Sequence, residues 1–164
     1  MIITISAAPR IETAEVAKKL AAKHGLAIQP DPSAQVCAEY GFQTIYEMPA
    51  TLQARVREQL IREHCEVVSK TDDLLLNYSI FPWLADWMRW FWSSTPTERW
   101  EEIMEVAAGA TRRYELIYHV ESDKVQMYDG YLWLDKRNSS QINSLLRHLY
   151  REFEVSDRVR FEIN

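Results

Sequence analysis

The chain has 164 residues, a formal net charge of −5, 47% apolar residues and 26% charged residues. This length suits one domain with one sizeable core, and the composition excludes a disordered chain. Because acidic and basic residues are interleaved, the charge argues against a broad nucleic-acid-binding face.

Short apolar runs alternate with amphipathic stretches along the chain. The first run, 2–6, is β-branched and predicts a buried strand, and residues 13–24 follow it with helical spacing. In chain order, further strands are predicted at 26–29, 74–76, 114–120 and 159–163, and further helices at 33–40, 50–69, 81–92, 97–112 and 139–153. Residues 121–138 hold a turn signal at Asp129-Gly130 and predict little regular structure.

This alternation predicts an α/β three-layer sandwich with a mostly parallel sheet of about five strands, in one domain over residues 1–164. Ligands of such sheets bind beyond the carboxyl ends of the strands. We therefore expect residues 6–13, Asp31 and residues 77–79 to gather in one crevice. Asp31 stands between two prolines, so it is either a turn residue or a ligand contact.

No apolar run approaches the roughly 20 residues that span a bilayer, and the first residues lack the pattern of a secretory signal. We therefore expect a cytoplasmic protein with no membrane partner. The two cysteines, Cys37 and Cys65, form no metal-spaced pair, and the four histidines are scattered along the chain. No metal site is expected from this spacing.

The segment between the first strand and the first helix reads S-A-A-P-R-I-E-T over residues 6–13. A phosphate-binding loop, G-x-x-x-x-G-K-[ST], needs glycines for its converging N–H groups and a lysine for charge. Ser6 stands at the first glycine, Ile11 at the second and Glu12 at the lysine, so only Thr13 matches. A carboxylate at the lysine position would oppose a triphosphate by about 1–4 kcal/mol. Residues 6–13 have two alternative interpretations: a plain strand-to-helix turn, or an anion site made by Arg10 and the helix start.

With this layout and loop position, the chain resembles the small P-loop kinases that act on nucleosides, nucleotides and nicotinamide riboside. A second place carries the resemblance: the run L-L-L leads into Asn77-Tyr78-Ser79, where the family has Asp-Arg-Ser. Asn77 cannot take up a proton near neutral pH, and Tyr78 offers no positive charge. Arg112-Arg113 is similar to the family's lid, although arginines near a helix C-terminus are also favoured by its dipole.

The resemblance implies a kinase fold whose ATP site has been lost. Our first hypothesis is a degenerate kinase homologue that transfers no phosphate, needs no cofactor and acts by binding another protein or by oligomerising. The second is an active nucleoside or nucleotide kinase that uses ATP and Mg²⁺, with Asp31 as the base and with phosphates held by Arg10, Thr13, Arg112 and Arg113. The third is a nucleotide sensor without turnover, in which Asp31, Asn77 and Tyr78 contact the ligand.

The predicted helix 81–92 is unusually rich in aromatic residues. Trp83, Trp87 and Trp90 are three to four residues apart and so share one helical face. These tryptophans either pack in the core or form an interface with a partner or a second subunit, because tryptophan dominates interface energetics. Stacking on a base is a third use that the resemblance implies.

Overall fold

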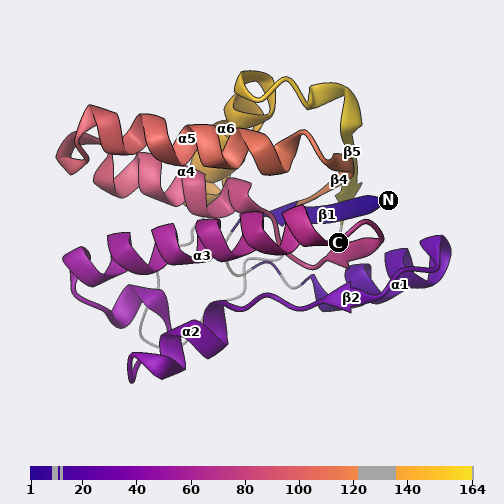
Figure 1. Cartoon of the computed structure of the whole chain (residues 1–164), viewed down its shortest axis with the longest axis horizontal. Coiled ribbons are helices and arrows are strands. Elements are labelled where there is room, and N and C mark those ends of the chain that lie inside the picture. Colours follow the sequence, from indigo (N-terminus) through magenta and orange to yellow (C-terminus); the bar gives the residue numbers. More distant parts are fainter. Residues whose placement is uncertain (9–10, 12, 122–135, 164) are drawn as a thin grey trace.

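A computed structural model of the chain describes residues 1–8, 11, 13–121 and 136–163, without the side chains of 136–139 and 163 (Figure 1). Its five strands form one sheet in the order β2-β3-β1-β4-β5, and every pairing is parallel. The strands are β1 Ile2–Ala7, β2 Ile28–Gln29, β3 Leu74–Leu76, β4 Tyr114–Glu121 and β5 Val159–Ile163. The predicted α/β class and parallel sheet are confirmed.

The helices follow the predicted pattern closely. They are α1 Ala14–His24, α2 Ser33–Glu39, α3 Ala50–Lys70, α4 Ile80–Phe91, α5 Thr97–Thr111 and α6 Lys136–Glu152. Three 3₁₀ turns were not predicted: η1 Ile45–Glu47, η2 Trp92–Ser94 and η3 Ser156–Arg158. The second strand is shorter than predicted because the Leu26 N–H bonds to the Ala21 carbonyl and closes α1, after Gly25 adopts a left-handed φ of 67°.

Helices cover both faces of the sheet, as the sandwich prediction requires. Ile3 and Ile5 of β1 point to one face, where Ala17 and Leu20 of α1 pack on them. The other face carries the larger core, built from α3, α4, α5 and α6 over residues such as Ile2 of β1. In Figure 1, α3, α4 and α5 run side by side on this face, which agrees with their contacts. The alternation along β1 thus divides the core into two layers.

The buried face of α3 is not purely apolar. Arg57 and His64 are fully buried on it, among Val56, Leu60 and Ile61. Charged and polar groups are rarely this buried without partners, so both must be accounted for by neighbouring elements. Within the part of the chain that the structure describes, no helix is both long and apolar enough to cross a membrane.

Candidate ligand-binding site

A cavity of about 780 Å³ lies beyond the carboxyl ends of the first three strands in the sequence. Its walls come from the end of β1, the start of α1, α2, η1, α3, the segment after β3, and α4. Asp31 and residues 77–79 line it together with Ala7, Ala8, Ile11 and Thr13, so the structure brings most of the expected crevice residues together. The volume is within the range of pockets that hold small molecules.

Aromatic side chains form part of the cavity wall. Tyr46, Tyr78 and Trp83 line the cavity, and the rings of Tyr78 and Trp83 lie 5.3 Å apart between centroids. Burial, and the negative charges of Asp31 and Glu63, raise the pKa of Tyr78 to about 12. Tyr78 is therefore a neutral phenol at physiological pH. It offers the cavity an aromatic surface and no charge.

A buried ion pair joins α3 and α4 beside the cavity. The Arg57 guanidinium, 0% exposed, donates from Nη2 to Asp86 Oδ2 at 3.0 Å, and the Tyr46 hydroxyl donates to the same oxygen at 3.0 Å. Arg57 Nη1 also reaches the carbonyl and the side-chain oxygen of Gln53 at 3.3 and 3.2 Å. Both terminal nitrogens of the Arg57 guanidinium are thus hydrogen-bonded within the protein.

Three buried polar atoms of cavity-lining residues lack a hydrogen-bond partner among the described residues. They are Arg57 Nε, Asn77 Oδ1 and Ser79 Oγ. Ser79 precedes α4 but its side chain makes no capping bond to the helix. Since buried polar groups in native proteins are nearly always paired, unpaired donors and acceptors around one cavity indicate a site for a polar ligand or for water.

Two carboxylates at the cavity also serve as local caps. Asp31 Oδ1 accepts from the Ser33 N–H at 2.8 Å and from its hydroxyl at 2.5 Å, at the start of α2. Glu47 Oε2 accepts from the Gln43 N–H at 2.9 Å and closes a capping box on η1. The turn interpretation of Asp31 therefore holds, and Asp31 still lines the cavity. With Asp86, the described lining residues include three carboxylates and one guanidinium, so their balance is acidic.

Among the residues that the structure describes between β1 and α1, Ala8, Ile11 and Thr13 line the cavity, and the Thr13 hydroxyl makes no capping bond to α1. Ser6, at the first glycine position, is fully buried, and its Oγ accepts from the Tyr150 hydroxyl of α6 at 2.7 Å. His119 Nδ1 lies 2.7 Å from that hydroxyl on its other side. Ser6 is thus part of the core; Arg10, Glu12 and Asp129-Gly130 lie outside the described residues.

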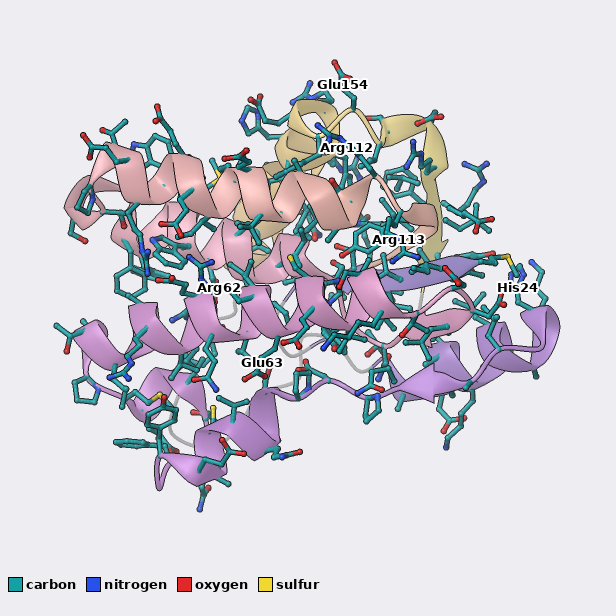
Figure 2. All side chains as sticks on the ribbon, viewed as in Figure 1. His24, Arg62, Glu63, Arg112, Arg113 and Glu154 are labelled. Carbon is teal, nitrogen blue, oxygen red and sulfur yellow. The ribbon has the colours of Figure 1, made fainter. Side chains whose placement is uncertain are left out.

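The predicted arginine clamp requires correction. Arg113 donates to the carbonyls of Val68 and Thr71, the latter at 3.0 Å, and to Asp72 Oδ1 at 2.7 Å. It therefore ties the end of α3 to the amino end of β4. Figure 2 shows Arg112 and Arg113 where α5 leads into β4. Ligands sit at the carboxyl ends of the strands, so neither arginine reaches the cavity with Thr13 and Asp31.

The three tryptophans of α4 do not form one interface, which also corrects the prediction. Trp83 lines the cavity. Trp87 is 3% exposed and its Nε1–H donates to Thr95 Oγ1 at 2.8 Å, so it belongs to the core. Trp90 is 57% exposed. The helix runs from the cavity through the core to the surface, and one helical face therefore passes through three environments.

Several lining residues were not predicted from the sequence, among them Tyr46, Glu47, Arg57 and Asp86. Two of them carried a usable signal. Asp86 is the only carboxylate in the apolar helix I-F-P-W-L-A-D-W-M-R-W-F, and Arg57 follows Val56 on the buried face of α3. A charge within an apolar face requires an opposite charge nearby, which predicts a pair between the two helices.

No known family model matches the chain, and no curated protein matches it. Its structure is similar to that of the NadR protein, which was solved in complex with NR. The TM-score is 0.70 at 11% sequence identity, and the match covers 98% of this chain and 43% of NadR. The chain thus spans less than half the length of NadR. At this identity the likeness shows the fold alone, which is P-loop kinase-like as the sequence predicted.

Proposed function

We propose that this chain binds a nucleoside-sized ligand, neutral or cationic, in the cavity of its kinase-like fold and transfers no phosphate. The observation that supports this proposal most is that different residue types line different parts of the cavity. Among the described lining residues, the aromatic rings, the unpaired polar atoms and three carboxylates come from Asp31, η1, α3, the segment after β3 and α4, whereas the segment between β1 and α1 contributes Ala8, Ile11 and Thr13. The proposal joins the degenerate-homologue hypothesis to the sensor hypothesis and needs neither ATP nor Mg²⁺.

The acidic balance determines the preferred charge of the ligand. Asp31, Glu47 and Asp86 outnumber Arg57 among the described lining residues. Like charges in a partly buried site repel by several kcal/mol, so a phosphorylated ligand is disfavoured there. A positively charged ring is attracted both by the carboxylates and by the faces of Tyr78 and Trp83. NadR, which shares this fold, was solved with NR, and that complex supports the choice of nucleosides as probes.

The active-kinase hypothesis has less support. It needs Arg112 and Arg113 at the phosphates, but Arg113 is bonded to the end of α3. It also needs Asp31 as a base, but Asp31 Oδ1 is engaged by Ser33.

Calorimetric and thermal-shift titrations test the proposal. Nicotinamide riboside, a cationic nucleoside, and adenosine, a neutral one, should raise the melting temperature; AMP should do so less, and ATP with Mg²⁺ should not. Trp83→Ala should weaken nucleoside binding about tenfold, because stacking on an aromatic ring contributes about 1–3 kcal/mol. Trp90→Ala, at an exposed tryptophan of the same helix, is the matched control. If no nucleoside binds at millimolar concentration, the ligand proposal is wrong. Phosphate transfer from ATP would contradict the proposal that the chain transfers no phosphate.

A second candidate function is a contact with a different protein. Trp90, near the end of α4, is 57% exposed, and Trp92, which begins η2, is 54% exposed. Exposed tryptophans are unusual unless a partner covers them. A cross-linking amino acid placed at position 90 would identify that partner, and the purified partner should lose affinity for the Trp90→Ala/Trp92→Ala variant but keep it for Trp83→Ala. Equal affinity for both variants would exclude this surface.

A further inference from the structure

The strand β5 forms one edge of the sheet. Its residues pair with β4 from Ile117↔Val159 to Glu121↔Ile163, and no other described strand pairs with it. Arg160, Phe161 and Glu162 are all exposed, and Phe161 is 55% exposed. The free side of an edge strand presents N–H and C=O groups that no strand pairs, and an exposed aromatic ring on it adds apolar surface. Such an edge is a template for another strand. In the present structure the Arg160 guanidinium donates to the carbonyls of Asp157 and Val159, both at 2.9 Å, so Arg160 must leave these bonds to reach a second strand.

The sequence of β5, V-R-F-E-I, is complementary to itself in one arrangement only. When two copies run antiparallel about a two-fold axis at Phe161, Arg160 of each copy lies opposite Glu162 of the other. Val159 then lies opposite Ile163, and Phe161 opposite Phe161. Opposite charges and aromatic pairs facing each other stabilise antiparallel strands. Parallel, in-register pairing would place Arg160 opposite Arg160 and is disfavoured.

A hollow of about 390 Å³ adjoins this edge on the α6 side. Arg147, Tyr150, Arg151 and Phe161 line it, and the Arg147 guanidinium lies 4.9 Å from the centre of the Phe161 ring. In the two-fold arrangement, Phe161 of the second copy lies on the same face of the sheet, beside this hollow. The ring would then be removed from water by α6 residues as well as by its counterpart.

We propose that β5 pairs antiparallel with β5 of a second copy of this chain about a two-fold axis at Phe161, so that one sheet continues through both copies. Isologous contacts of this kind satisfy closed two-fold symmetry and leave no further β5 edge to extend. A single pair of five-residue strands buries less than the roughly 1,200–2,000 Å² of a standard stable interface. The dimer is therefore weak and depends on concentration.

Sedimentation velocity over a wide concentration range tests the pairing. The wild-type chain should dimerise reversibly. Arg160→Glu and Glu162→Arg should each weaken self-association about tenfold or more, because each places like charges opposite one another. Arg55→Glu, at an exposed arginine of α3, is the matched control and should dimerise like the wild type. A wild-type chain that stays monomeric at every concentration overturns the proposal.

A mixing experiment fixes the register. An equimolar mixture of the two single variants should form heterodimers, because both cross-strand positions then join opposite charges again. Combining both substitutions in one chain should likewise restore homodimers. Circular dichroism confirms that each variant is folded. Failure of both restorations would show that the strands do not pair about Phe161, and unchanged association of the single variants would place the contact elsewhere.

Discussion

His64 is a buried imidazole that remains neutral at physiological pH. Its Nε2 is hydrogen-bonded to the Tyr114 hydroxyl, and its ring lies 5.0 Å from that of Tyr78. Burial lowers the pKa of His64 from 6.5 to about 3. A neutral histidine on the buried face of α3 therefore serves the core and supports the cavity wall through Tyr78.

This burial predicts a pH dependence of stability. Between pH 6.5 and about 3 the unfolded chain takes up a proton at His64 that the folded chain does not, so the free energy of unfolding falls as the pH falls. From about pH 7 to pH 5 the wild type should lose about 2 kcal/mol more than His64→Gln. Urea denaturation at each pH measures the difference.

His148, exposed on α6, is the matched control for this titration. His148→Gln should keep the wild-type slope, since it leaves the buried His64 in place. A His64→Gln variant that also keeps that slope would show that His64 is not buried as a neutral group.

The helices α3 and α4 are joined beside the cavity by the pair of Arg57 and Asp86. The arginine also lies 5.4 Å from the centre of the Phe91 ring, so its charge contacts α4 at two points. Buried pairs contribute little net stability, but a single remaining member is costly because its charge stays buried without compensation. The pair therefore fixes the spacing of the two helices more than it stabilises them.

A double-mutant cycle tests this role. Asp86→Leu alone should lower the free energy of unfolding by about 3–5 kcal/mol, because it leaves the Arg57 guanidinium buried without an opposite charge. Adding Arg57→Met should recover most of that loss, although the bond from the Tyr46 hydroxyl to Asp86 is not restored. Chemical denaturation of all four chains gives the coupling energy. Additive losses would mean that the two side chains do not interact.

Across the whole molecule, the cavity and the arginine pair Arg112-Arg113 lie at opposite ends of the strands. Asp31, Asn77 and Tyr78 are at the carboxyl ends of the strands, whereas Arg112 and Arg113 are at the amino end of β4. We therefore expect that introducing the phosphate-loop residues alone does not create a site for ATP, because Arg112 and Arg113 remain at the amino end of β4.

Loop repair tests this separation. Ser6→Gly, Ile11→Gly and Glu12→Lys together recreate the phosphate-loop pattern, yet the variant should gain no melting-temperature shift with ATP and Mg²⁺. The variant should also be about 1 kcal/mol less stable, since the Tyr150 hydroxyl loses Ser6 as an acceptor. The unmodified chain is the reference in both measurements. A clear shift with ATP would mean that the loop was the only part lost.

The fold followed from the sequence because its signals are local. Apolar runs such as 2–6 and the spacing of α3 give strand and helix positions without any knowledge of neighbours. The site depended on contacts far apart in the chain. Asp31, Asn77 and Tyr78 were found because strand ends meet at one edge of a parallel sheet, whereas Arg113 was misplaced because nothing local shows that it bonds to α3.

The central place of β1 in the sheet has a consequence for how the chain acquires its structure. Ile2 pairs with Leu74 on one side and with Tyr114 on the other. At a synthesis rate of about 5–20 residues per second, Tyr114 leaves the ribosome's active centre roughly 6–20 s after Ile2. Throughout that time the central strand of the sheet lacks one neighbour, so the nascent chain is exposed to aggregation. Folding also waits on distant contacts, and refolding of the full chain should be slow for its size.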